Sequence, residues 1–544
     1  MENASTTSGV PLKDTLIPFL AGPAASKEKI RAVQTALEGT DGKFWRKELG
    51  KWAARMVPVE LLVPEVHRDW RPLVRESILF VVWKLAPSRL APKIIQQMEL
   101  GAEVPAEVRL LRFIEKVPGL QKIGQVLARN RHLDPRLRHA LIQLENGIAD
   151  VSMEEIRSIV ERELQPQIEA YAIRLEPKIL SEASVSAVVA FTWQNPATGR
   201  RERGVFKVLK PHIPGCYAED MKILGQLARH LARKHRKDSS HLGRLADTLT
   251  EIRLLLEREV DFPREQATLA NALGEYRHLQ GVRIPQVIPL LSTVTITALT
   301  FERGKKVADA RVVPAKLRRS VADRLARALL AIPAFSKAND AIFHADPHAG
   351  NLLYDRRRNE LVILDWALTE RLTRKQRRNV VLLVLMLVLR DAIGMEKAIQ
   401  DLCQLNRDAH NEMRTIRRHI ESLLDALPLT GLPGPMDAMR LLDAIALEGI
   451  RFPAALLMFR KASFTLEGVV ADVARTKAGL DSLMANQALA NWKDTVGCLL
   501  TLLSARDWVA LEWSALTFAS RVCVRSVTRP LQNWAGLGAH ADAA

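Results

Sequence analysis

Apolar residues recur with helical spacing over most of this chain, and the pattern is interrupted by strand-like segments in the middle. From about residue 28 to 170 the spacing is that of amphipathic helices. Ser152-Met-Glu-Glu155 has the form of a capping box, and it precedes an apolar helical face formed by Ile156, Ile159, Val160 and Leu164. The first 27 residues are rich in Ser, Thr, Ala and Gly, which predicts a flexible tail.

Strand-like segments begin near residue 180. Ser184–Thr192 and Gly204–Leu209 are apolar or β-branched, and the turn-forming residues Asn195–Gly199 separate them, which predicts a hairpin. Ile284–Phe301 is uncharged, but two prolines and many β-branched residues predict two strands rather than a membrane-spanning helix.

Helical spacing returns in three later segments, at about 217–277, 315–337 and 372–544. The most apolar stretch, Val380–Leu389, is only ten residues long, whereas a spanning helix needs about 20, so it predicts a core helix. A helical extension, a small sheet with helices and a long helical region together predict an α+β fold.

Composition adds constraints on location and partners. The 544 residues include four cysteines without a C-x-x-C pair, which predicts a reducing, cytoplasmic environment and no disulfide scaffold. The N-terminal residues have no signal-peptide pattern. The formal net charge of +18 suits an anionic lipid surface, a nucleic acid or simply a solvated basic surface. With 5% aromatic residues there are few platforms for base stacking, so no nucleic-acid partner is predicted.

Candidate chemistry is concentrated in Phe343–Leu353 and Val362–Trp366. Asp346 and Asn351 have the spacing Asp-x-x-x-x-Asn, and Asp365 follows an apolar run. Kinase-type phosphoryl transfer needs one carboxylate at the acceptor, and an amide and a second carboxylate as magnesium ligands. Any one of these residues alone is better explained as a turn or strand-end residue, but the combination favours a catalytic site.

Zinc is an alternative for the same segment, because His344 and His348 are four residues apart. Pro347 and Gly350 predict a loop instead of a helix here, and no Glu follows the first histidine. The histidine pair therefore does not predict a zinc site.

A kinase-like site also needs a cation for the nucleotide phosphates. Lys207 lies in a predicted strand between apolar Phe206 and Val208, whereas Lys210 beside Pro211 is predicted to be peripheral. A glutamate from the following helix should pair with Lys207. No glycine-rich loop precedes it, since Ser181–Ala187 contains no glycine, and an ordinary protein kinase fits poorly.

On these residues the chain resembles the UbiB-like (AarF) family of atypical kinases over roughly residues 108–370. The family Lys-x-Gly-Gln motif matches at Lys122-Ile-Gly-Gln125. Its alanine-rich loop matches only at Ala183, Ser184 and Val188, and its Asp-Phe-Gly element is Asp365-Trp366-Ala367 here. The other matching positions are Lys207, Glu259, Asp261, His344, Asp346, Pro347, His348, Gly350 and Asn351.

The resemblance implies a bilobed protein-kinase-like fold that binds ATP and Mg²⁺. The implied boundaries are a tail at 1–27, a helical extension at 28–170, an N-lobe at 171–304, a C-lobe at 305–430 and a helical region at 431–544. The resemblance assigns Asp346, Lys207 and Glu265 to catalysis, Asn351 and Asp365 to the metal, and Ala183, Ser184, Lys207 and Glu302 to the nucleotide. Lys122 and Gln125 would form a lid that pairs with Glu259 or Asp261. Five of these residues are expected to converge on one cleft: Lys207, Glu265, Asp346, Asn351 and Asp365.

The implied activity is ATP hydrolysis or small-molecule phosphotransfer in ubiquinone or other isoprenoid-lipid metabolism at a membrane. Lipid-biosynthetic enzymes and a second copy of the chain are possible partners under this interpretation. Three alternatives stay open: a catalytically inactive nucleotide-binding scaffold, a small-molecule kinase of the aminoglycoside or choline type, and a nucleic-acid binder.

The C-terminal residues suggest how the chain could meet a membrane. Charged residues such as Arg506 and Glu512 make a spanning helix too costly. Aromatic residues interleaved with arginines instead predict either an interfacial segment or helices packed onto the core: Trp508, Trp513, Phe518 and Trp534, with Arg521, Arg525 and Arg529.

Overall fold

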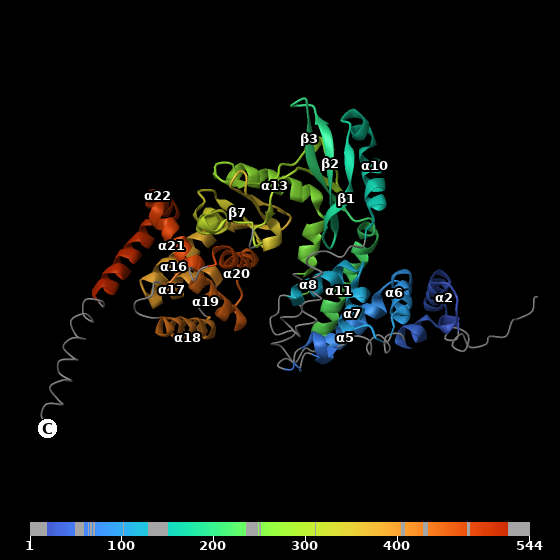
Figure 1. The fold of residues 1–544 in the computed structure, drawn as a ribbon. Coiled ribbons are helices and arrows are strands. Elements are labelled where there is room, and N and C mark those ends of the chain that lie inside the picture. Colours follow the sequence, from blue (N-terminus) through green and yellow to red (C-terminus); the bar gives the residue numbers. More distant parts are fainter. Residues whose placement is uncertain are drawn as a thin grey trace, which may run out of the picture. The chain divides into compact units, whose positions relative to one another are not determined.

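The computed structural model divides the chain into two compact units (Figure 1). The first comprises Met1–Pro263 and Val287–Phe301, and the second comprises Arg264–Gln286 and Glu302–Ala544. The structure describes residues 19–48, 59–63, 65, 68, 71–101, 103–128, 151–234, 249, 252–309, 312–403, 409–427, 433–475 and 479–520.

The first unit begins with the predicted helical extension. The capping box at Ser152 and Glu155 is present at the start of α10, as predicted. Residues 252–260 are also helical and lead into α13 (Phe262–Tyr276), which crosses from the first unit into the second. The other helices are α2 (Ser26–Glu38), α4 (Val59–Leu62), α5 (Arg71–Lys84), α6 (Pro87–Glu99), α7 (Ala106–Ile114), α8 (Pro118–Ala128), α10 (Met153–Ala170) and α11 (Ile213–Lys234).

An antiparallel sheet with the order β1-β2-β3-β5 forms the rest of this unit. The predicted hairpin is confirmed, and its strands pair from Ser186↔Leu209 to Asn195↔Arg200. The apolar face of α10 packs on this sheet and shares a buried core with it (Figure 1). The strands are β1 (Arg174–Glu182), β2 (Ser186–Asn195), β3 (Arg200–Leu209) and β5 (Ile296–Thr300).

Two features of the sheet differ from the prediction. Strand β1 was not predicted, because it is an edge strand with largely exposed side chains and an internal proline, so it has no apolar alternation. Two strands were predicted for Ile284–Phe301, and the prediction is wrong for the first of them. Only Ile296–Thr300 is a full strand there, while Pro289–Leu291 is a 3₁₀ turn and Val287 forms an isolated bridge to Leu299.

Strand β3 requires glycine at one position. The rings of Phe191 and Phe206 are stacked with centroids 3.9 Å apart in the buried core. A Cβ atom at Gly204 would lie 2.5 Å from Cζ of Phe191. Glycine at 204 therefore allows the backbone to approach this aromatic pair.

The second unit carries two small sheets. In one, β7 (Asp340–His344) pairs antiparallel with β10 (Thr369–Thr373). The other has the order β4-β9-β8-β6. Its strands are β4 (Val282–Arg283), β9 (Glu360–Ile363), β8 (Leu352–Asp355) and β6 (Lys305–Lys306), and the 3₁₀ turn η5 (Ala349–Asn351) precedes β8. The turns between these strands carry Asp346, Asn351 and Asp365.

Helices make up the remainder of the second unit, so the predicted α+β character is confirmed. The predicted core helix at Val380–Leu389 corresponds to the C-terminal part of α16 and its cap residue, and most apolar side chains of α16 are buried. No helix in the described part of the chain is both long and apolar enough to cross a membrane. The helices are η3 (Ala315–Leu317), α14 (Arg318–Ala326), the π-helical η4 (Arg327–Ala331), α15 (Ile332–Phe335), α16 (Arg374–Val388), α17 (Ala392–Cys403), α18 (His410–Ala426), α19 (Pro435–Leu447), α20 (Ala454–Ala474), α21 (Leu480–Ala490), α22 (Trp492–Leu502) and residues 505–520.

Candidate active site

His344 connects the two loops that carry the candidate carboxylates of the second unit. It ends β7 and is fully buried. Its Nδ1 accepts a hydrogen bond from the backbone N–H of Asp346 at 3.2 Å, and its Nε2 lies 3.0 Å from the carbonyl oxygen of Leu364. One side chain thus fixes the backbone next to Asp346 and next to Asp365.

This hydrogen-bond pattern sets the protonation state of the histidine. An acceptor at Nδ1 and a donor at Nε2 describe a neutral imidazole with its proton on Nε2. Burial lowers the pKa of His344, against opposing effects of the Leu364 carbonyl and of Asp365 and Asp346, so the neutral form is favoured. Both ring nitrogens are occupied by the backbone, so His344 has no lone pair to offer to zinc.

Asn351 is held next to Asp346 by the turn between them. Asn351 Nδ2 donates to the carbonyl oxygen of Asp346 at 3.3 Å, and the backbone N–H of His348 donates to the same oxygen at 2.8 Å. The N–H of Leu364 donates to the carbonyl of Asn351 at 2.8 Å, which ties the Asp365 segment to this turn. Asp346 and Asn351 are partly exposed and Asp365 is exposed. The three predicted residues of the acidic site therefore lie in adjoining, mutually hydrogen-bonded turns.

Asp365 adopts a left-handed backbone conformation with φ of 51°, and its Oδ1 accepts from the N–H of Ala367 at 3.4 Å. Aspartate tolerates this conformation better than most residues. Ala367 is not among the positive-φ residues, so the backbone conformation does not call for glycine there. Trp366 is fully buried, and its ring packs edge-on against His344 and Tyr276, with centroids 5.2 and 5.3 Å apart.

In the first unit, Lys207 lies on β3 as predicted, with buried Phe206 and Val208 on either side. Its register partners are Val188 on β2 and Thr297 on β5, so it occupies an inner strand of the sheet. Its ammonium group lies 5.7 Å from the ring centroid of Phe262. A lysine on an inner strand is held at a defined place, which suits contact with a phosphate.

The prediction that Lys210 is peripheral is wrong. Its side chain is 1% exposed, and its Nζ lies 3.1 Å from Oε2 of Glu182. The backbone N–H of Lys210 also donates to the carbonyl of Val185 at 2.9 Å. The turn between β1 and β2 closes over the end of β3 and buries this lysine, an arrangement that the neighbouring proline did not indicate.

The same turn carries Ala183 and Ser184, the candidate nucleotide-binding residues of the altered alanine-rich loop. The N–H of Ala183 donates to the carbonyl of Ser186 at 2.8 Å, which closes the turn. Ser184 is buried, and its Oγ donates to Oε2 of Glu259 at 3.0 Å. The loop is therefore fastened to the helical segment at 252–260.

Lys122 on α8 donates to the other oxygen of Glu259, so the predicted pairing between these two motifs is present. α8 has a second anchor, because Asp220 Oδ2 accepts from the N–H of Gly119 at 2.9 Å and Oδ1 accepts from Arg89 at 2.6 Å. Burial raises the pKa of Asp220, and Arg89 opposes that rise. The side chain of Gln125 lies outside the described residues. Asp261 is exposed, and the lid role of these residues stays a prediction.

The remaining predicted residues are Glu265 and Glu302, which belong to the second unit. Glu265 is buried in the first turn of α13. Glu302 forms an ion pair with Arg283, whose other guanidinium nitrogen lies 3.1 Å from Glu360. Since Lys207 belongs to the first unit and Glu265, Asp346, Asn351 and Asp365 to the second, the expected convergence of all five remains a prediction.

Residues 143–399 match the family model described as the ABC1 atypical kinase-like domain. This segment of the chain is similar to ABC1 atypical kinase-like domains. The resemblance predicted from the motifs is thereby confirmed, and so is the kinase-like α+β fold class. The match contains the candidate residues from Ala183 to Asp365, while Lys122 and Gln125 precede it.

Curated relatives agree with this assignment. The chain is 30% identical to "Probable protein kinase UbiB" of Xanthomonas campestris pv. campestris (strain 8004), over 51% of the chain and 50% of that protein. It is 24% identical to "Protein ACTIVITY OF BC1 COMPLEX KINASE 7, chloroplastic" of Arabidopsis thaliana, over 65% of the chain and 50% of the relative. An uncharacterized protein of Synechocystis, sll1770, is 26% identical over 65% of the chain and 59% of its own length. The chain thus spans about half the length of these relatives.

Among solved structures, the chain is similar to the complex of Rv3197 with erythromycin from Mycobacterium tuberculosis. The likeness has a TM-score of 0.39 and 14% sequence identity, and covers 65% of this chain and 92% of that one.

The oxygen ligands at the acidic turns fit the cofactors that the family implies. Asp365 and Asn351 offer a carboxylate and an amide oxygen, the hard ligands that magnesium accepts while keeping several waters. The remaining ligands of such an ion come from water and from nucleotide phosphates. His344, which holds the two turns together, is the residue whose role sequence spacing alone did not reveal.

Proposed function

We propose that the chain is an ATP-binding, magnesium-dependent phosphotransferase or ATPase of the UbiB-like type. The observation that carries the proposal is the arrangement of Asp346, Asn351 and Asp365 in adjoining turns, connected through neutral His344. The match of residues 143–399 to the ABC1 atypical kinase-like model supports the reaction class. The proposal includes a role in ubiquinone or other isoprenoid-lipid metabolism, which the names of the UbiB relatives favour.

Each residue has a distinct part in this proposal. Asn351 and Asp365 hold magnesium, which would neutralise charge on the transferred phosphoryl group. Asp346 orients the acceptor hydroxyl or water and takes up its proton. Lys207 orients the nucleotide phosphates and Glu265 holds Lys207, while Glu302 and the Ala183–Ser184 turn contact the nucleotide. Positioning by His344 keeps the two acidic turns in register without contributing charge.

The lid belongs to the same proposal. Lys122 and Ser184 share the two oxygens of Glu259, so the Lys-x-Gly-Gln helix and the altered alanine-rich loop are joined through one carboxylate. Movement of α8 would therefore shift the loop that is proposed to contact the nucleotide. This coupling supports regulation of nucleotide access by Lys122, Gln125, Glu259 and Asp261.

Attachment to a membrane surface is the proposed setting. α22 exposes Trp492 and Leu500, and the helix at 505–520 exposes Val509, Trp513 and Leu516. The side chain of Trp508 is half-buried and its indole nitrogen is fully buried, so this aromatic residue packs inward. Trp534 and the three arginines predicted to lie beside the aromatics fall outside the described residues. The outward-facing apolar side chains suit the interface of an anionic lipid surface.

Magnesium-dependent ATP hydrolysis, measured with and without anionic liposomes, tests the proposal. Asp365→Asn should abolish most turnover, because it replaces a charged metal ligand by a neutral one while keeping its shape. Asp340→Asn is the matched control, since Asp340 is an exposed aspartate at the opposite end of β7. Magnesium-dependent ATP binding without turnover would favour the nucleotide-binding scaffold, and hydrolysis unaffected by Asp365→Asn would refute the assigned metal ligand.

A further inference from the structure

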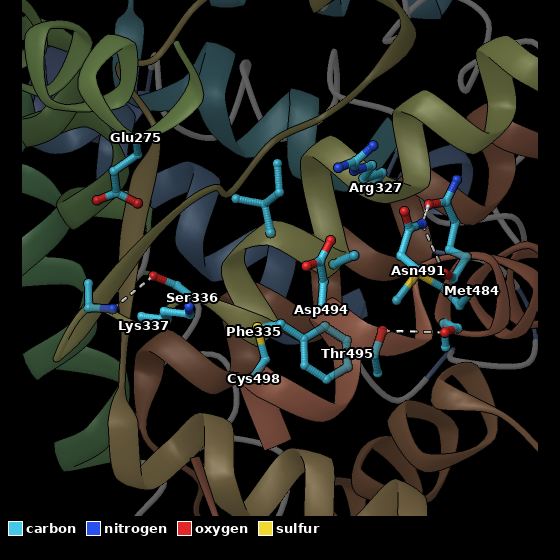
Figure 2. A pocket seen from close by; sticks show the side chains of 15 residues that line it. Glu275, Arg327, Phe335, Ser336, Lys337, Met484, Asn491, Asp494, Thr495 and Cys498 are labelled. Atoms are coloured by element: carbon cyan, nitrogen blue, oxygen red, sulfur yellow. Dashed lines mark hydrogen bonds between the residues drawn. The ribbon is translucent and has the colours of Figure 1, made fainter. Parts of the chain in front are cut away.

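The second unit contains a cavity away from the acidic turns. Its volume is about 370 Å³, which falls in the range of small-molecule sites. One wall is formed by η4 and α15 of the kinase-like domain, and the opposite wall by α21 and α22 (Figure 2). No residue assigned to the acidic site lines it, so a ligand here would not be the nucleotide.

The body of the cavity is apolar. Ile332 and Phe335 contribute from α15, Met484 and Ala488 from α21, and Cys498 from α22. All five side chains are partly buried rather than packed in the core, so they keep apolar surface toward the cavity. An aromatic ring beside a flexible thioether adapts well to an elongated apolar molecule.

Four charged side chains line the cavity: Glu275, Arg327, Lys337 and Asp494. Glu275 accepts from the backbone N–H of Ile342 and lies near Arg371 and Arg377. Lys337 and Asp494 have opposite charges and both act on Cys498, whose thiol pKa is raised by burial, lowered by Lys337 and raised by Asp494. These two side chains therefore bring one positive and one negative charge to that end of the cavity.

Arg327 lines the cavity from η4. Among the described residues its guanidinium group has no ion-pair or hydrogen-bond partner, and the side chain is exposed at the cavity. It occupies the first position of the π-helical η4, a local departure from α-helical geometry that often accompanies functional sites. Guanidinium groups bind carboxylates and phosphates in a planar, two-point geometry.

We propose that this cavity binds a small anionic amphiphile, with its apolar body against Phe335 and Met484 and its anionic head group on Arg327. The apolar lining provides the burial that a hydrocarbon body needs, and Arg327 provides a guanidinium group with no ion-pair or hydrogen-bond partner among the described residues. Gln487 also lines the cavity. Its amide oxygen accepts a hydrogen bond from Asn491 Nδ2 at 3.3 Å, so its amide NH₂ group is the part that can donate to a ligand.

Calorimetric titration of the full chain with four probes tests the proposal. Decanoate should bind, whereas acetate, which has the same head group without the chain, should not. Decanol and decyltrimethylammonium have the same chain with a neutral and a cationic head, and each should bind at least about tenfold more weakly than decanoate, the scale of one charged hydrogen bond. Equal affinity for the anionic and cationic probes would overturn the assigned head group, and acetate binding as tightly as decanoate would overturn the amphiphile.

Variants locate the binding. Ala488→Trp should fill the cavity and abolish decanoate binding, while Ala485→Trp, the same change at an exposed position of α21, should leave it intact. Arg327→Gln should weaken decanoate about tenfold without changing decanol, and Arg327→Lys should retain most of the affinity. Undiminished decanoate binding in an Ala488→Trp protein that melts like wild type would overturn the site. If Ala488→Trp fails to fold, the decanoate affinities of Arg327→Gln and Arg327→Lys test the site instead. Arg327 is exposed, so its replacement should leave the fold intact.

Discussion

Asp507 accepts hydrogen bonds from two nitrogens of the Arg378 guanidinium, including one of 2.7 Å from Nε. Asp507 belongs to the helix at 505–520 and Arg378 to α16, so this ion pair fastens the last described helix to the kinase-like domain. A second contact supports it, since Ser514 donates to Asp391 at 2.5 Å. The C-terminal helices are thus tied by polar contacts and not by apolar packing alone.

The Arg378–Asp507 ion pair predicts a pH-dependent contribution to stability. Burial alone would raise the pKa of Asp507, but hydrogen bonds from Arg378 and Ser504 lower it to about 2, from its ordinary value of 3.8. A carboxyl group whose pKa is lower in the folded state stabilises the fold above the unfolded pKa, and this contribution is lost as pH falls through the folded pKa. The contribution should therefore be constant at neutral pH and decline between about pH 4 and pH 2.

Thermal unfolding of wild type and Asp507→Asn at a series of pH values measures this effect. The variant should melt lower at neutral pH, and the difference should shrink as the pH is lowered below about 4. Asp425→Asn is the control, because Asp425 is exposed on α18 and should give no comparable difference. A difference between wild type and Asp507→Asn that stays constant down to the lowest pH at which both fold would contradict the role of the ion pair.

The two lysines at the end of β3 should behave in opposite ways. Lys210→Met removes the ammonium group that lies 3.1 Å from the carboxylate of Glu182, a side chain that is 9% exposed, and breaking a buried ion pair in this way costs on the order of 3–5 kcal/mol. Lys207→Met should cost less stability but remove most ATP turnover, if Lys207 orients the phosphates. Urea unfolding and ATPase assays on both variants separate the roles.

A paired substitution completes this test. Lys210→Met combined with Glu182→Leu should recover most of the lost stability, because the double variant removes both charges of this ion pair. Retention of full turnover by Lys207→Met, with loss of turnover in a stable Lys210→Met protein, would show that the phosphate lysine has been misassigned.

The contact between Lys122 and Glu259 predicts an effect on nucleotide exchange. Lys122→Met removes one of the two groups that hold Glu259, and should raise the rate of nucleotide release several-fold if α8 acts as a lid. Deleting residues 108–130 is a poorer experiment, because Leu110, Phe113 and Ile114 belong to the hydrophobic core of the unit.

Stopped-flow release of a fluorescent ATP analogue measures the effect of the lid. The exchanged pair Lys122→Glu with Glu259→Lys should restore slow release, which a merely destabilised protein would not do. Unchanged release rates in a folded Lys122→Met variant would count against the lid and leave the ion pair a structural role.

Local spacing explains why the acidic turns could be predicted from the sequence. Asp346 and Asn351 are five residues apart, and a single turn between two short strands fixes their relation. The hairpin that carries Lys207 is local in the same way, since its strands are joined by a few turn residues. Such features depend on neighbouring residues, which the sequence displays directly.

Contacts between distant segments could not be predicted in this way. Glu182 and Lys210 lie on different strands, and the burial of Lys210 depends on how the β1–β2 turn closes over β3. Edge strand β1 has no apolar alternation, so no local pattern marks it. The link from Lys122 to Glu259 spans 137 residues and was predicted only through the family motifs. The central role of His344 follows from hydrogen bonds to two loops, which spacing does not reveal.

The exposed apolar face of the C-terminal helices leads to the last prediction. Val509, Trp513 and Leu516 are spaced to share one side of the helix at 505–520, and Trp513 is 73% exposed. The opposite side of the same helix is held to the protein by Asp507 and Ser514, so the apolar side faces outward. An apolar helical face on a chain of net charge +18 should bind anionic lipid through both its apolar and its charged groups.

Flotation with anionic liposomes at low and high salt measures this binding. Replacing Val509, Trp513 and Leu516 by serine should weaken it about a hundredfold or more, because each large apolar side chain contributes roughly 1.5–3 kcal/mol when it is buried. Replacing Ala505, Ala510 and Ala515, exposed alanines of the same helix, by serine is the matched control and should have little effect. High salt should reduce binding of wild type by screening the charged contribution, whereas the apolar contribution persists. Absence of flotation at low salt, or equal flotation of the two triple variants, would show that this face does not meet the membrane.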